Sequence, residues 1–266
     1  MGPILNAMVA MGGIGLALSV VLGIASKVFY VYVDPKVVAV DECLPGANCG
    51  GCGYAGCSDA AVAMVAGKAP PNACKAGGDD VAAAIAAVLG VSAGSAERDI
   101  INIFCKGTHS AAKRKYNYKG VLDCRAAVLL AGGDKSCKYG CLGLGTCVAN
   151  CPFGALKMGE AGLPVVNEKL CTGCGTCVNI CPRHIPALIK ESQRVATLCS
   201  SHDGGKIVKD ICNIGCQGCG KCRKACPEEA IIIDKFLAIV DGTKCTGCGA
   251  CFEDCPTGII QSLIAA

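Results

Sequence analysis

Residues 171–182 read CTGCGTCVNICP, a run of four cysteines with the spacing C-x2-C-x2-C-x3-C followed by proline. This spacing is typical of [4Fe–4S] sites, in which the first three thiolates hold one cubane and the fourth ligates a second cluster. The run therefore predicts a partner run elsewhere in the chain. Runs at 216–227 and 245–256 repeat the spacing, and 140–152 carries the variant GCLGLGTCVANCP.

The four runs form two pairs, and each pair predicts one bacterial-type 2[4Fe–4S] ferredoxin unit, so the fold class is α+β. In the variant run one ligand is missing, because Leu144 stands where the middle cysteine would be. We assign its role to Cys137, four residues before Cys141. Residues 163–166 and 231–234 are predicted hairpin strands, and helices are predicted to begin at the proline of each Cys-Pro pair.

A separate four-cysteine module precedes these units. Residues 44–57 read LPGANCGGCGYAGC, and Cys74 follows a short apolar helix, which gives the spacing C-x2-C-x4-C-x16-C. The glycines let the backbone fold tightly around a cluster. No proline follows Cys74, so this cluster is predicted to be single.

Within each pair of runs, the cysteine before the proline of one run is the fourth ligand of the cluster held by the other run. Together with the separate module, this predicts five ligand sets. They are Cys49, Cys52, Cys57 and Cys74 (cluster 1); Cys137, Cys141, Cys147 and Cys181 (cluster 2); Cys171, Cys174, Cys177 and Cys151 (cluster 3); Cys216, Cys219, Cys222 and Cys255 (cluster 4); and Cys245, Cys248, Cys251 and Cys226 (cluster 5).

Five cysteines remain outside these sets. The spacing of Cys124 and Cys137, with twelve residues between them, recurs in Cys199 and Cys212, as an internal duplication would produce. We predict that Cys105, Cys124, Cys199 and Cys212 bind a sixth [4Fe–4S] cluster between the units. The alternative is that they are small core residues, as free cysteine often is. Cys43 fits no spacing and is predicted to be an ordinary thiol.

The composition excludes other classes of cysteine-rich protein. The chain has 266 residues with 25 cysteines, 17% charged residues, a net charge of +4 and only 4% aromatic residues. A secreted disulfide scaffold is disfavoured because the cysteine number is odd and the spacings are those of metal ligation. Zinc ribbons use paired C-x2-C spacings, whereas these runs are triple.

The N-terminal segment predicts one membrane span. Residues 3–25 contain no charged side chain, and a helix of this length can cross a hydrocarbon core of roughly 30 Å. A cleaved signal peptide would need a basic first region and an A-x-A site, and a buried soluble helix is the remaining alternative. Lys27 and Lys36 follow the span, so the positive-inside rule predicts a single-pass protein of the inner (cytoplasmic) membrane with its soluble part in the cytoplasm.

Two connecting segments are predicted to have distinct roles. Residues 90–95, GVSAGS, form a flexible linker that lets the four-cysteine module move relative to the ferredoxin units. Residues 106–119 carry five cations and no acid, which is either a solvated face or a docking surface for an acidic partner; no nucleic-acid motif surrounds them. The predicted domains are an anchor (1–26), the module (27–90), a linker with a strand/helix segment (91–136), ferredoxin unit 1 (137–192) and unit 2 (193–266).

Taken together, the span, the LPGANCGGCGYAGC module, the stretch YGCLGLGTCVANCPFGAL (139–156) and the second ferredoxin unit resemble the B subunit family of the Rnf complex. The resemblance covers essentially the whole chain. It implies a subunit of a membrane ferredoxin:NAD oxidoreductase that couples electron transfer to sodium or proton translocation. It also implies that the chain takes electrons from soluble ferredoxin and passes them to membrane partners, with flavin and NAD on other subunits.

Cubanes held by four thiolates have no open coordination position, so they carry electrons and make no bonds. The chain would therefore be a subunit of a redox-driven translocase without catalytic residues of its own. Two alternatives remain open. One is an Fe–S subunit, or polyferredoxin, of another membrane oxidoreductase, and the other is a non-catalytic redox sensor. The histidines, His109, His184 and His202, are predicted to be surface or capping residues.

Overall fold

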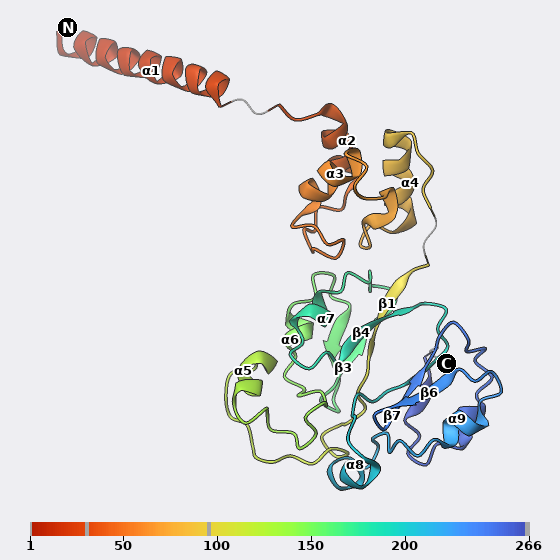
Figure 1. Cartoon of the computed structure of the whole chain (residues 1–266). Helices are drawn as coiled ribbons and strands as arrows, with labels where there is room; N and C mark the ends of the chain where they lie inside the picture. Colours follow the sequence, from red (N-terminus) through yellow and green to blue (C-terminus); the bar gives the residue numbers. More distant parts are fainter. Residues whose placement is uncertain (1, 30–31, 95–96, 264–266) are drawn as a thin grey trace.

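The computed structural model describes residues 2–29, 32–94 and 97–263. Ser95 of the predicted linker and residues 264–266 of the predicted second unit lie outside the described residues. The chain forms an N-terminal helix, a small helical module and two ferredoxin-like units that lie side by side (Figure 1). The module lies between the N-terminal helix and the two units.

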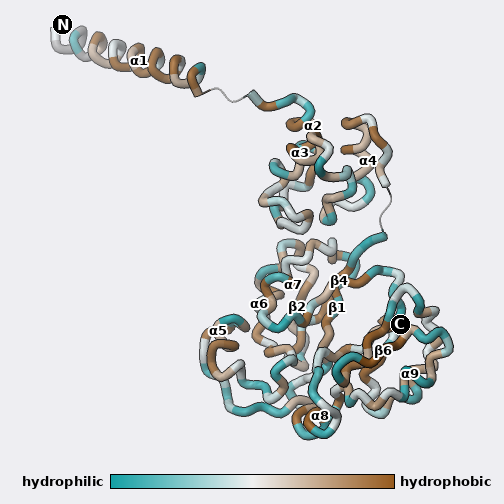
Figure 2. The backbone as a smooth tube through the Cα atoms, viewed as in Figure 1, coloured by the Kyte–Doolittle hydropathy of each residue, from teal (hydrophilic) through white to brown (hydrophobic). Residues whose placement is uncertain are grey.

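The N-terminal helix α1 (Gly2–Val28) is apolar along its length (Figure 2). Its segment Met8–Val28 is long and apolar enough to cross a membrane. Large apolar side chains such as Leu16 (71% exposed) and Leu22 (68% exposed) are not covered by the rest of the chain. Exposed apolar surface of this extent is typical of a segment that lies in lipid, and α1 contains the whole predicted span.

The four-cysteine module is a cluster of short helices around its own apolar core. Asp34 caps the first helix, because its carboxylate accepts a hydrogen bond of 2.8 Å from the Lys36 N–H. Val40, Ala61 and Ile85 are fully buried between the helices. The elements are α2 (Pro35–Cys43), α3 (Cys57–Val65), the 3-10 helix η1 (Pro71–Ala73) and α4 (Gly78–Leu89).

The first ferredoxin unit is closed by a long-range strand pair. β1 (Asp99–Ile103) runs antiparallel to β4 (Pro186–Lys190), with Asp99 opposite Lys190. The pair therefore joins a strand that lies upstream of residue 137 to the end of the predicted unit 1. The remaining elements are α5 (Cys124–Leu129), α6 (Thr146–Ala149), β2 (Leu156–Met158), β3 (Pro164–Val166) and α7 (Thr176–Ile180), with β2 and β3 forming a hairpin.

The second unit repeats this plan. β5 (Val195–Thr197) pairs with β8 (Ile260–Ser262) as β1 pairs with β4, and β6 (Ile231–Asp234) forms a hairpin with β7 (Leu237–Val240). The helices of this unit are α8 (Gly205–Ile211), α9 (Lys221–Ala225) and α10 (Ala250–Glu253).

The helices do not begin at the prolines, as predicted, but end before them. Each short helix of a cysteine run starts after a glycine with left-handed backbone, for example Gly145 (φ 75°) and Gly220 (φ 73°). The residue before a proline disfavours the helical conformation, so the helix stops at or before the last cysteine of the run. The glycine in each C-x2-C-Gly therefore marks the start of the helix.

Candidate metal centres

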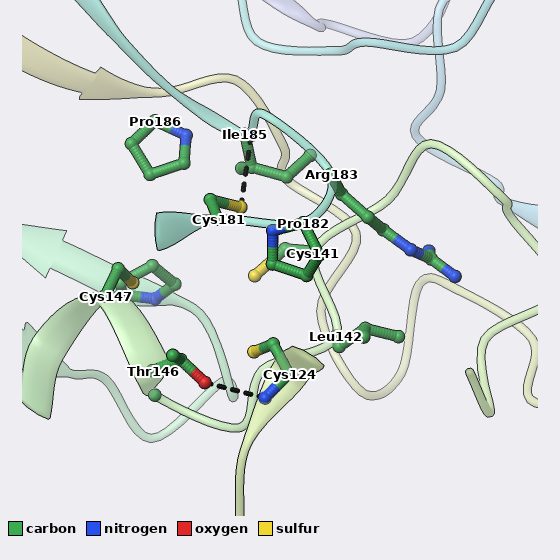
Figure 3. A pocket seen from close by; sticks show the side chains of 12 residues that line it. Cys124, Cys141, Leu142, Thr146, Cys147, Cys181, Pro182, Arg183, Ile185 and Pro186 are labelled. Carbon is green, nitrogen blue, oxygen red and sulfur yellow. Dashed lines mark hydrogen bonds between the residues drawn. The ribbon is translucent and has the colours of Figure 1, made fainter. Parts of the chain in front are cut away.

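Four cysteines of the first unit line one cavity, which we call the first cavity (Figure 3). They come from the start of α5, the loop before α6, α6 itself and the residue before Pro182. The Ile185 N–H donates to Cys181 Sγ at 3.4 Å, and the Cys124 N–H donates to the Thr146 hydroxyl at 2.6 Å. The four cysteines are Cys124, Cys141, Cys147 and Cys181.

This grouping differs from the predicted set for cluster 2, because Cys124 lines the cavity and Cys137 does not. Asp123 caps α5, and its carboxylate accepts hydrogen bonds from the Arg125 N–H at 2.7 Å and from the Thr146 hydroxyl at 3.3 Å. The cap fixes the first turn of α5 against α6. Cys124, the first residue of that turn, therefore reaches the position left open by Leu144.

A second group of four cysteines lines a cavity between the two units, which we call the seam cavity. Cys105 follows β1, and Cys199 follows β5 at the same offset. Their partners, Cys137 and Cys212, each precede a cysteine run by four residues. The lining cysteines are Cys105, Cys137, Cys199 and Cys212.

The predicted sixth set therefore needs the opposite exchange, with Cys137 in place of Cys124. The equal spacing of Cys124–Cys137 and Cys199–Cys212 gives a misleading alignment of the repeat. In the fold, Cys105 corresponds to Cys199, because each follows the strand that opens its unit. Matching the two strand-then-cysteine segments, 99–105 and 195–199, would have pointed to the grouping that lines the seam cavity.

The seam cavity shares its walls with its neighbours on both sides. The backbone N–H of Cys141, from the first cavity, donates to Cys105 Sγ at 3.4 Å. The N–H of Cys216, from the second unit, donates to Cys199 Sγ, also at 3.4 Å. Two sulfurs of the seam cavity therefore accept a hydrogen bond from the backbone of a cysteine in a neighbouring site, one in each unit.

Cysteines of the other four predicted sets also lie near one another. One cavity is lined by Cys151, Cys171, Cys174 and Cys177, and another by Cys216, Cys219, Cys222 and Cys255. Cys226, Cys245 and Cys248 lie close enough to Cys251 to act electrostatically on its thiol. In the module, Cys74 is close to Cys52 and Cys57, and Cys49 precedes Cys52 on the same glycine-rich loop.

The geometry favours a cluster over a single ion. Tetrahedral Zn²⁺ at a Zn–S distance of 2.3 Å draws its thiolates to about 3.8 Å from one another. Within the described residues, no three Cys, His, Asp or Glu side chains come close enough together to hold a single metal ion. The cysteines instead surround hollow spaces, which is the arrangement that a cubane between four thiolates requires.

Burial raises the pKa of several of these thiols and so favours their protonated form. Burial, and next the charge of Cys105, raise the pKa of Cys141 to about 12. Burial and the neighbouring Cys174 likewise raise the pKa of Cys177 to about 12. Thiolates are the ligand form, so a cation must displace these protons, and metal binding stabilises the fold as it does so.

The four-cysteine module contacts the first unit through Gly51 and Lys75. Gly51 packs against the backbone of Cys174, since a Cβ on Gly51 would lie 2.5 Å from the Cys174 carbonyl oxygen. Beside this contact, Lys75 Nζ lies 3.2 Å from an Asp99 carboxylate oxygen. The contact joins the loop of one cysteine set to the loop of another.

The basic segment 106–119 serves the structure at least in part. Lys113 pairs with Asp210 of the second unit at 2.8 Å, and Arg114 pairs with Asp134 at 3.1 Å. The segment also forms an isolated bridge from Ala112 to Cys212. It therefore joins the two units behind the seam cavity. Of the histidines, His202 stacks edge-on against Tyr139 at 5.5 Å.

Comparison with known proteins agrees with this division. Residues 44–76 match the family described as "Putative Fe-S cluster", and residues 136–185 and 215–260 each match the family of the 4Fe-4S dicluster domain.

Similar proteins share nearly the whole chain. The B subunit of an ion-translocating oxidoreductase complex of Methanosarcina acetivorans is 47% identical over 91% of this chain and 91% of its own. The B subunit of a Na⁺-translocating ferredoxin:NAD⁺ oxidoreductase complex of Acetobacterium woodii is 45% identical over 88% of this chain and 70% of its own. The B subunit of a proton-translocating ferredoxin:NAD⁺ oxidoreductase complex of Clostridium ljungdahlii is 43% identical over 91% and 85%. The chain therefore belongs to the B subunit family of Rnf-type ion-translocating oxidoreductase complexes.

Proposed function

We propose that this chain accepts electrons one at a time from reduced soluble ferredoxin and relays them to membrane subunits of an Rnf-type complex. The observation that carries the proposal is the chain of cysteine-lined sites, in which each site lies next to another from the second unit to the module. A [4Fe–4S] cluster, when bound to four thiolates, supplies one-electron transfer without an open coordination position.

Six sets of four cysteines are the proposed ligands. Four of them keep the predicted membership, and the two others exchange Cys124 and Cys137 relative to it. The sets are Cys49, Cys52, Cys57 and Cys74; Cys124, Cys141, Cys147 and Cys181; Cys151, Cys171, Cys174 and Cys177; Cys105, Cys137, Cys199 and Cys212; Cys216, Cys219, Cys222 and Cys255; and Cys226, Cys245, Cys248 and Cys251.

The contacts between sites support one order of passage. From the second unit the path crosses the seam cavity through Cys216 and Cys199, and then enters the first cavity through Cys105 and Cys141. Cys147 of the first cavity acts electrostatically on Cys177 of the next site. From there, Cys174 touches Gly51 of the module.

The two ends of this path differ in exposure. Cys219 and Cys248 of the second unit are exposed, whereas the other cysteines are buried or half-buried. We therefore place the entry of electrons from ferredoxin at the second unit. The module is the exit, since it follows α1 in the chain and contacts the first unit.

The segment 90–94, GVSAG, between the module and the first unit supports movement of the module between the first unit and a membrane acceptor, because such linkers are flexible. Relative motion is the ordinary behaviour of two domains in one chain unless their interface is large and hydrophobic. The positive charges Lys27 and Lys36 after the span place the module and both units on the cytoplasmic side in this proposal.

Iron analysis and ferredoxin reduction test the proposal together. Anaerobically prepared protein should hold about 24 iron atoms per chain, against about 20 if the seam cavity binds none. Reduced ferredoxin should bleach the Fe–S absorbance and give EPR signals of reduced [4Fe–4S] clusters. A Cys199→Ala variant should lose about 4 iron atoms, and the control Cys43→Ala should lose none. Protein that dithionite reduces but ferredoxin does not would contradict the relay.

A further inference from the structure

Lys135 is a buried cation between the first cavity and the seam cavity. Its side chain is 1% exposed, and its Nζ donates to the Gly107 carbonyl oxygen at 2.6 Å. Among the described residues, no carboxylate forms an ion pair with it, since the neighbouring Asp134 pairs with Arg114. A buried charge needs a counter-charge, because removal from water costs several kcal/mol.

Cysteines of both sites lie near Lys135. Its charge acts on Cys141 of the first cavity. Its hydrogen-bond partner Gly107 lies beside the seam cavity, since a Cβ on Gly107 would lie 3.5 Å from Cys105 Sγ and 3.8 Å from Cys212 Sγ. The ammonium is therefore close to ligands of both sites.

Arg183 is a second cation at the same boundary. Its guanidinium donates to the carbonyl oxygens of Cys137 and Gly140, both at 2.6 Å, and to that of Gly132. Its side chain also lines the first cavity. Three carbonyl acceptors hold the guanidinium between Cys137 of the seam cavity and Cys141 of the first cavity, and both thiols act electrostatically on it.

The second unit carries neither cation. Thr257 follows Cys-Pro there as Arg183 does in the first unit, and its hydroxyl lies 3.7 Å from Cys255 Sγ. Two residues before Cys212 stands Asp210, at the place that Lys135 has before Cys137. Asp210 has a side chain that is 76% exposed and pairs with Lys113. The two units therefore differ in charge where their cysteines correspond.

We propose that Lys135 and Arg183 raise the reduction potentials of the clusters in the first cavity and the seam cavity, so that electrons collect between the two units. The inference rests on the proposed function. A cubane with four thiolates is anionic, and reduction adds a further negative charge. A nearby cation stabilises the reduced form more than the oxidised form, and burial weakens the screening of that interaction. Both residues tune ligand sites and bind no iron themselves.

An EPR-monitored redox titration of the intact protein tests this proposal. The component due to the first cavity is the one that disappears in a Cys124→Ala variant. In Lys135→Met and in Arg183→Thr, which introduces the residue of the second unit, the ratio of reduced to oxidised cluster at a fixed potential should fall about tenfold, equivalent to a shift of about 59 mV for one electron.

Two further variants serve as controls. Lys138 is next to Cys137 but is 67% exposed and pairs with Asp203 at 3.2 Å, so Lys138→Met should leave the component in place. Arg183→Lys keeps the charge and should retain most of the wild-type potential.

The proposal is overturned if Lys135→Met and Arg183→Thr hold wild-type iron and neither moves the component. If Lys135→Met loses iron, the test rests on Arg183→Thr alone. Arg183 is only half-buried, so its replacement is expected to disturb the fold less. These outcomes are distinct from a failure of the relay, which would appear in the wild-type protein as missing clusters or as no reduction by ferredoxin.

Discussion

The two ferredoxin units have the same strand pairs and the same pattern of cysteine runs, but they complete one site in different ways. In the second unit Cys219, from within the run, lines the cavity, whereas the first unit has Leu144 at that position and its cavity is lined by Cys124 from an inserted segment. That segment, residues 106–136, also supplies Lys135 and the contacts between the units. A cluster site can therefore keep its geometry while one ligand comes from another part of the chain.

The largest expected effect tests this substitution of ligands directly. Cys124→Ala should remove about 4 iron atoms per chain and the EPR component of the first cavity. Adding Leu144→Cys to that variant should restore both, because residue 144 occupies the place that Cys219 has in the second unit. Iron analysis with EPR of the single and double variants is the measurement. The assignment fails if Cys124→Ala holds the wild-type amount of iron, or if adding Leu144→Cys restores none of the iron that Cys124→Ala loses.

The next effect concerns the cavity shared by the two units. Cys105→Ala and Cys199→Ala should each remove about 4 iron atoms and should leave the first unit oxidised when ferredoxin reduces the second. The reason is that each variant removes one of the four thiolates that line the seam cavity. Rapid-freeze EPR after mixing with reduced ferredoxin measures the distribution of electrons. Equal reduction of both units in these variants would show that electrons take another path.

A smaller effect is expected where the first unit, unlike the second, contacts the module. Gly51→Ala places a Cβ 2.5 Å from the Cys174 carbonyl oxygen. Overpacking costs roughly 1–3 kcal/mol, so the docked population should fall about fivefold or more. The rate at which the module cluster is reduced should fall with it, at unchanged iron content. Gly204→Ala, which enters open space in the second unit, is the control and should have the wild-type rate.

The smallest effect concerns the ion pair at the same contact. Burial opposes ionisation of Asp99, but hydrogen bonds from Lys190 and Lys75 outweigh it and hold its pKa below the ordinary value. The pair of Lys75 and Asp99 therefore stabilises docking fully at a pH above the ordinary carboxyl pKa. This stabilisation is lost as the pH falls through the lowered pKa of Asp99. Lys75→Met should weaken docking by roughly 0.2–1 kcal/mol, less at high salt. The measurement is the rate at which the module cluster is reduced, at low and at high salt. If salt does not change this rate in the wild type, the role of the ion pair is contradicted.

The sequence predicts the sites whose ligands follow one another closely. Cys171, Cys174 and Cys177 are grouped as their spacing requires, because a short loop leaves them few alternatives. The first cavity and the seam cavity are different, because their ligands are placed by distant contacts. Pairing of β1 with β4 brings Cys105 to the seam, and the Asp123 cap brings Cys124 to α6. Spacing along the chain contains neither fact, so a prediction from spacing exchanges Cys124 and Cys137.

The membership of the seam cavity has a consequence for the ancestry of the protein. Cys105 and Cys137 belong to one unit and Cys199 and Cys212 to the other, so neither half supplies a full ligand set. If the two units were encoded by separate genes, the site would be lost unless the two proteins bound each other again at this cavity. Iron shared at this site would thus keep the two halves in a single polypeptide.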